Sequence, residues 1–143
     1  MSTDTSGAAG YIGRPGPTPN LRRWWAAVTG LLLADIFLEA VFAGAMLSGA
    51  PWARAAHAAN AGLLIASTTV AGLVGVATLR RIPHGLRLGL TLLALAAVMA
   101  VQAAVGAISA KGANLLWVHV PLGVALVGFA AQALTSARRL GGD

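Results

Sequence analysis

Long apolar runs separated by short polar breaks dominate the chain. The runs extend over about residues 24–47, 53–79, 86–108 and 115–137. A helix needs about 20 predominantly apolar residues to cross the ~30 Å hydrocarbon core of a bilayer, and each run reaches that length. Because the connections are short, consecutive helices must be antiparallel neighbours. The predicted fold is all-α, an integral membrane up-down four-helix bundle.

The chain before the first run has a different character. Residues 1–21 are rich in Ser, Thr, Gly and Pro and lack apolar periodicity, which predicts a disordered tail. The apolar run that follows is about twice the length of a signal-peptide core, so no signal peptide is predicted. We therefore expect a tail over residues 1–21 and a transmembrane domain over residues 22–139.

Polar residues inside the runs occur in two similar pairs. Glu39 precedes His57 by 18 residues, and Gln102 precedes His119 by 17 residues. This spacing predicts that the bundle is built from two repeated helix pairs, each with one polar residue and one histidine at similar depth. The second and fourth helices are diagonal in an up-down bundle, so His57 and His119 should face each other across the core.

Composition supports a membrane location. The chain is 57% hydrophobic and 10% charged, whereas soluble domains carry about 25% charged residues. It has no cysteine, which excludes disulfides, thiolate metal sites and iron–sulfur clusters. The net charge of +6 comes from basic clusters between the apolar runs, without interleaved aromatic residues, so the lipid bilayer is the predicted partner and nucleic acid is not.

The basic residues also predict the orientation in the cell membrane. Eight of them flank one side of the four runs, and only Arg54 and Lys111 flank the other. Positively charged flanks face the cytoplasm, so both termini should be cytoplasmic. The eight are Arg14, Arg22, Arg23, Arg80, Arg81, Arg87, Arg138 and Arg139.

The two membrane histidines are candidate metal ligands. A neutral imidazole is a usual axial ligand for haem iron. One turn below each histidine the residue is small, Ala61 below His57 and Gly123 below His119, which leaves room for a flat macrocycle. We predict one haem b per chain, bound between His57 and His119. Zinc or copper is less favoured, because two imidazoles leave such a site short of ligands.

Three further residues are candidate pocket residues. Arg54 lies three residues before His57, where it could pair with a haem propionate or equally reach the interface as a solvated arginine. Glu39 falls near the level of the histidines and could line the pocket or only bond to a neighbouring helix. Gln102 is assigned to the pocket as well, although an isolated membrane glutamine more often joins two helices.

Asp35 lies one turn from Glu39 on the same helix face. An acid at mid-membrane costs about 2.5–3.5 kcal/mol on insertion scales. We expect Asp35 to be neutral and to bond to a neighbouring helix, with Ser67, Thr68 and Thr91 as available partners.

With these residues in place, the chain resembles one four-helix half of haem A synthase, a cytochrome oxidase assembly enzyme, or a related small four-helix membrane haem protein. The resemblance rests on the run from Val101 to Ile108 and on His119 with the small residues after it. The run from Val41 to Gly49, Trp52 and His57 match more loosely. The resemblance implies that His57 and His119 are haem ligands near the outer surface.

The chain also departs from this family. Arg54 stands where the family has a glutamate, Ala58 stands where it has an arginine, and only one half is present, so enzyme activity stays open. The expected role is electron transfer or haem handling near a respiratory or oxidase-assembly complex. Two copies could rebuild an eight-helix body as a homodimer. The alternative is a haem-free accessory subunit or small transporter with an intramembrane polar network.

Overall fold

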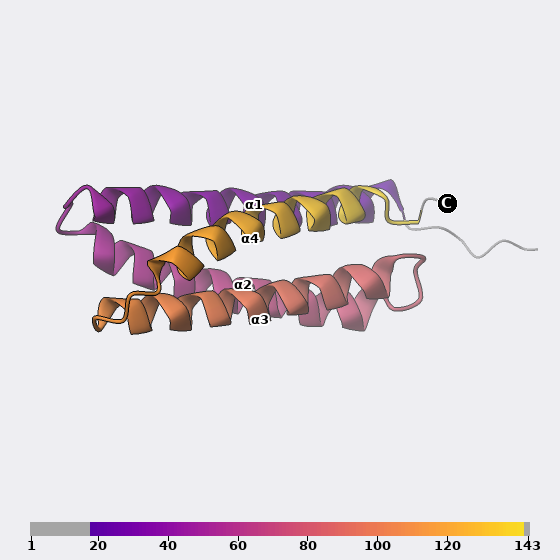
Figure 1. The fold of residues 1–143 in the computed structure, drawn as a ribbon. Helices are drawn as coiled ribbons and strands as arrows, with labels where there is room; N and C mark the ends of the chain where they lie inside the picture. Colours follow the sequence, from indigo (N-terminus) through magenta and orange to yellow (C-terminus); the bar gives the residue numbers. More distant parts are fainter. Residues whose placement is uncertain (1–17, 142–143) are drawn as a thin grey trace, which may run out of the picture.

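Four long helices run back and forth along one axis (Figure 1). The computed structural model describes residues 18–141, and its helices are α1 (Pro19–Leu47), α2 (Ala53–Leu79), α3 (Gly85–Ala110) and α4 (Leu116–Arg138). Each is long and apolar enough to cross a membrane, with mean hydropathies from 1.6 to 2.2. The chain is therefore a multi-pass membrane protein with an all-α fold, as the apolar runs predicted.

The helices pack as an up-down bundle. Helix α1 packs against α2 and α4, and α3 packs against the same two helices. Within residues 18–141 the backbones of the diagonal pairs, α1 with α3 and α2 with α4, do not approach each other. Figure 1 shows the first turns of α4 beside the end of α3 and its last turns beside α1. The predicted diagonal relation of the second and fourth helices is confirmed.

Helix α1 begins earlier than predicted. Its first residue is Pro19, whereas the apolar run begins at Trp24. The hydroxyl of Thr18 accepts a hydrogen bond from the Leu21 N–H at 3.4 Å, and proline suits the first turn because its missing N–H would have no partner there. Residues 19–21, expected in the disordered tail, are thus helical. The rest of that tail, residues 1–17, lies outside the described residues.

The two ends of the bundle differ in packing. The arginine end, defined by the start of α1 and the α2–α3 turn, contains most of the buried core. Fully buried side chains there include Trp25, Leu79, Leu88, Leu92 and Leu140. The helices α2 and α3 meet closely because both carry glycine. A Cβ atom on Gly75 would lie 3.1 Å from the Gly89 Cα, an approach of the kind that small residues allow between membrane helices.

The opposite end, the histidine end, is packed more openly. It comprises residues 37–63 and 100–125, and Ala53 is its single buried residue. The side chains that face the bundle axis there are only partly buried, including those of Glu39, His57, Gln102 and His119. The four polar residues singled out from the sequence therefore lie in the loosely packed half of the molecule.

The α2–α3 turn and the end of the chain close the arginine end. Gly85 is required in this turn because a Cβ atom there would collide with the carbonyl oxygen of Leu79. His84, just before it, adopts the left-handed region with φ 61°. After α4, Leu140 is buried in the core and the Gly141 N–H donates to the Pro83 carbonyl at 3.4 Å. The last described residues thus hold the turn against α4.

Candidate functional site

Each helix contributes one of the four polar residues singled out from the sequence to the histidine end. Glu39 comes from α1, His57 from α2, Gln102 from α3 and His119 from α4. In an antiparallel bundle, positions near the end of one helix and near the start of the next lie at the same level. The four residues accordingly form two polar contacts, one between α1 and α2 and one between α3 and α4.

The first contact joins Glu39 and His57. A carboxylate oxygen of Glu39 lies against Nδ1 of His57, and the two side chains are 13% and 24% exposed. The contact lacks the angles of a hydrogen bond, so both Glu39 oxygens and His57 Nδ1 are buried without a hydrogen-bond partner within residues 18–141. The pair is ionic only when His57 is protonated. The contact orients the imidazole of His57 through one ring nitrogen.

The second contact joins Gln102 and His119 at two points. The Gln102 side-chain amide donates to the backbone carbonyl of His119 at 2.7 Å. In turn, Nδ1 of His119 lies 3.1 Å from the backbone carbonyl of Gln102, which it can donate to when Nδ1 carries the proton. Like His57, His119 is therefore oriented through Nδ1.

Two glycines shape the surroundings of His119. A Cβ atom on Gly106 would lie 2.8 Å from His119 Cε1, so the imidazole packs directly on the α3 backbone. A Cβ atom on Gly123 would lie 3.1 Å from Gln102 Nε2. Gly123 was expected to clear space for a macrocycle, and the structure places the Gln102 amide there. Gly106 was missed as a site residue, although it lies one turn after Gln102, a signal that the sequence carries.

The two imidazoles face each other across the bundle. Their ring centroids are 6.5 Å apart and their planes form an angle of 79°. Each Nδ1 is engaged by a neighbour, and neither Nε2 forms a hydrogen bond with any residue of the range 18–141. Over the same range there is no cluster of three or more His, Cys, Asp or Glu residues that could hold a metal ion. The two histidines thus bring two imidazoles close together.

Asp35 forms a separate polar contact one turn deeper. Asn60 donates its side-chain amide to an Asp35 carboxylate oxygen at 3.0 Å, which joins α1 to α2. The partners expected from the sequence were different: Ser67 bonds to the carbonyl of Leu64, and the Thr68 hydroxyl is buried without a partner in the described chain. Asn60 lies three residues after His57 on the same face of α2, so helical spacing could have identified it.

Two other predicted pocket residues stay outside these contacts. Arg54 is exposed and forms no ion pair with any described residue. Ala61 is partly buried on α2, one turn after His57. Two further polar atoms, Gln102 Oε1 and the Ser109 hydroxyl, are buried at the histidine end without hydrogen-bond partners among residues 18–141. Buried polar atoms usually have partners, so this end has hydrogen-bonding capacity that the described residues do not use.

Comparison of the chain with protein-family models, with curated proteins and with solved structures gives no match.

Proposed function

We propose that this protein binds one haem b at the histidine end, with His57 and His119 as the two axial ligands through their Nε2 atoms. The observation that carries the proposal is the pairing of both Nδ1 atoms with neighbours. Metal-binding histidines almost always donate their other ring N–H to a carboxylate or backbone carbonyl. A Glu39 carboxylate oxygen lies against Nδ1 of His57 on one side, and the Gln102 carbonyl lies 3.1 Å from Nδ1 of His119 on the other.

The separation of the rings is consistent with one metal between them. Metal–imidazole bonds are about 2 Å long, which puts each ring centroid about 3 Å from the metal. Two such ligands on opposite sides would have centroids about 6 Å apart, and those of His57 and His119 are 6.5 Å apart. The histidines come from diagonal helices, so they approach the bundle axis from opposite sides.

The open packing of the histidine end supports a bulky ligand. The bundle there contains one buried residue, Ala53, whereas the arginine end has a dense core. Proteins otherwise fill their interiors to a density close to that of organic crystals. In this proposal Ala61 lies on the inner side of the pocket, Gly123 leaves room for the Gln102 amide that bonds to His119, and the exposed Arg54 pairs with a propionate.

A bis-histidine haem supplies one-electron redox chemistry. The role of the protein would therefore be electron transfer or haem handling beside a respiratory or oxidase-assembly complex. In the same proposal the bundle descends from a duplicated helix pair, both termini are cytoplasmic, and the haem lies near the outer surface. The resemblance to half of haem A synthase supports this assignment, and synthase activity is not part of it.

Absorption spectroscopy of purified protein tests the proposal. The protein should be produced with an ample haem supply and should show the Soret band of six-coordinate, low-spin haem. We expect His57→Ala and His119→Ala each to give a high-spin spectrum or lose the haem. His84→Ala is the matched control, because His84 lies at the arginine end, and it should keep the wild-type spectrum. A colourless wild type, or low-spin spectra in both single variants, would reject the haem site.

One observation favours a second candidate. The polar contacts Glu39–His57, Asp35–Asn60 and Gln102–His119 each join two helices that are adjacent in sequence. Such contacts can hold membrane helices together without any cofactor. A haem-free accessory subunit or small transporter would then be the alternative. A wild type without haem, in which His57→Ala or His119→Ala weakens the fold, would support this reading.

A further inference from the structure

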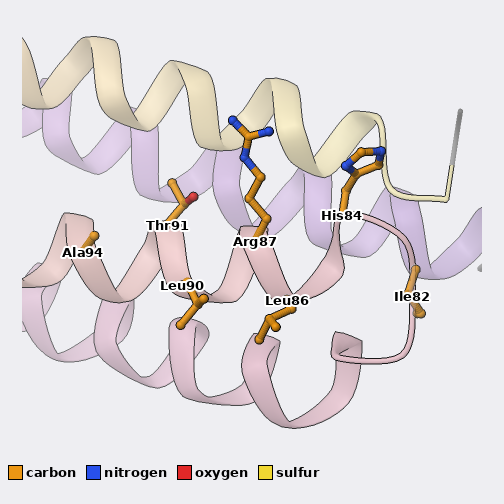
Figure 2. Close-up of a pocket in the computed structure, with 7 residues that line it drawn as sticks. All are labelled: Ile82, His84, Leu86, Arg87, Leu90, Thr91 and Ala94. Atoms are coloured by element: carbon orange, nitrogen blue, oxygen red, sulfur yellow. The ribbon is translucent and has the colours of Figure 1, made fainter.

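An open trough lies at the arginine end, along the start of α3. It has a volume of about 590 Å³, and its lining includes His84, Leu86, Arg87, Leu90, Thr91 and Ala94 (Figure 2). Arg87 precedes Gln102 by 15 residues on the same helix, which is about 22 Å along the axis. The trough is therefore separate from the polar residues of the histidine end.

The trough is amphipathic. Figure 2 shows the side chains of His84, Arg87 and Thr91 on one side of α3, pointing toward the ribbon of α4, while Leu86 and Leu90 point to the other side. His84 reaches this position from a left-handed backbone conformation, φ 61°, which is costly for a residue other than glycine. The trough thus combines donors for an anion with a neighbouring apolar surface.

The charge of this end is not balanced by the described chain. Two acidic residues occur in residues 18–141, and both are deeper in the bundle, Asp35 with Asn60 and Glu39 with His57. A second cavity, which shares Ile82 with the trough, is lined by Arg80 and Arg81. The unpaired arginines at this end are Arg22, Arg23, Arg80, Arg81, Arg87, Arg138 and Arg139, none of which forms an ion pair within the described range. Their counter-charge must come from outside these residues.

The depth of the trough fits a lipid. Arg87 lies in the first turn of α3, a helix long and apolar enough to span a membrane, and Ala94 lies seven residues further along it, about 10 Å along the helix axis. A phosphate is recognised by arginine through paired charge-assisted hydrogen bonds, and basic pockets beside membrane helices bind anionic head groups. A soluble anion would use only the polar side and leave the leucines without a partner.

We propose that the trough binds an anionic phospholipid of the adjoining leaflet. Its phosphodiester lies against Arg87 and His84, the Thr91 hydroxyl faces the ester oxygens one turn deeper, and the first part of an acyl chain packs along Leu90 and Ala94. This assignment is independent of the haem proposal, because no residue of the trough belongs to the histidine end.

Lipid binding to the purified, delipidated protein tests the proposal. Native mass spectrometry in a mild detergent would measure the affinity for phosphatidylglycerol, for zwitterionic phosphatidylcholine and for inorganic phosphate. We expect phosphatidylglycerol to bind more tightly than phosphatidylcholine. Arg87→Gln should weaken phosphatidylglycerol binding by about tenfold or more, because it removes a hydrogen bond between two charged groups. Thr91→Val should weaken it less.

Arg139→Gln is the matched control, because it removes the same charge from an exposed arginine at the same end but outside the trough. It should change the affinity by less than about twofold. Equal losses in Arg87→Gln and Arg139→Gln would show diffuse electrostatic attraction and overturn the site. Competition by inorganic phosphate as strong as that by phosphatidylglycerol would assign a soluble anion and overturn the lipid.

Discussion

Replacing Gly106 by alanine tests the packing of the histidine end most directly. The added Cβ atom would lie 2.8 Å from His119 Cε1, 3.3 Å from Nδ1 and 3.4 Å from Nε2. Carbon atoms in contact are normally about 3.5–4.0 Å apart, so the imidazole must shift by about 0.7 Å or more. Such a shift is large enough to take Nδ1, now 3.1 Å from the Gln102 carbonyl, out of hydrogen-bonding distance.

The expected effect can be worked out from these contacts. Loss of the hydrogen bond costs about 0.5–1.5 kcal/mol, and an off-rotamer imidazole costs a similar amount. Alanine also favours a helix over glycine by about 1 kcal/mol, which offsets part of the loss. Gly62→Ala isolates that gain, because a Cβ atom on Gly62 meets no atom within 4 Å. Gly106→Ala should therefore be less stable than Gly62→Ala by about 1–3 kcal/mol.

Unfolding of the detergent-solubilised protein by a denaturing detergent would measure the two free energies of unfolding. In haem-loaded protein, the same shift of His119 should weaken haem retention in Gly106→Ala and leave Gly62→Ala unchanged. Equal stability of the two variants would refute the close packing of His119 on α3. Because the stability comparison does not depend on haem, it separates the structure of the site from its proposed function.

Three other measurements address the rest of the bundle. Asn60→Ala should lower the free energy of unfolding by about 1–3 kcal/mol, because it leaves a partly buried acid without its partner. A double-mutant cycle with Asp35→Ala would show no coupling if the 3.0 Å contact contributes nothing. Gly89→Ala should destabilise the α2–α3 pair by about 1–3 kcal/mol, since a Cβ atom there meets the Val76 backbone nitrogen at 2.5 Å. Its control, Gly128→Ala, meets open space and should be neutral or stabilising. Reporter fusions at residue 50 and at the C-terminus should lie on opposite sides of the membrane, with the C-terminus cytoplasmic; a cytoplasmic residue 50 would reverse the predicted orientation.

Most helix bounds could be predicted from the sequence, because the thickness of the bilayer sets the length of each apolar run. The expected bounds of α2 coincide with the observed ones, and those of α3 and α4 differ by one or two residues at each end. The start of α1 was misplaced, since the Thr18 cap and Pro19 determine it and neither contributes to an apolar run. Hydropathy indicates which residues contact lipid, and a helix can extend beyond those residues when a capping residue stabilises its end.

For the candidate site, the sequence predicted which residues lie together but not the contacts between them. The similar spacing of the two polar pairs along the sequence was enough to predict that Glu39, His57, Gln102 and His119 lie near the same end of the bundle. The partners within the group were not predictable. Gln102 bonds to a backbone carbonyl, which leaves no signature in a sequence, and it reaches the His119 carbonyl because Gly123, four residues later in α4, has no side chain in the way. Sequence patterns identify side chains, whereas contacts to the backbone depend on the distance between two helices.

The contrast between a dense arginine end and an open histidine end has a consequence for the order of assembly. The contacts that define the topology, including the Gly75–Gly89 approach and the buried Trp25 and Leu79, are all complete without the histidine end. Regions with few buried contacts open at low free energy, without global unfolding. The bundle can therefore insert and fold first, while the helix ends around His57 and His119 still separate and close again. The proposed haem would then enter from the lipid, between the separated helix ends, after the chain has reached its final topology.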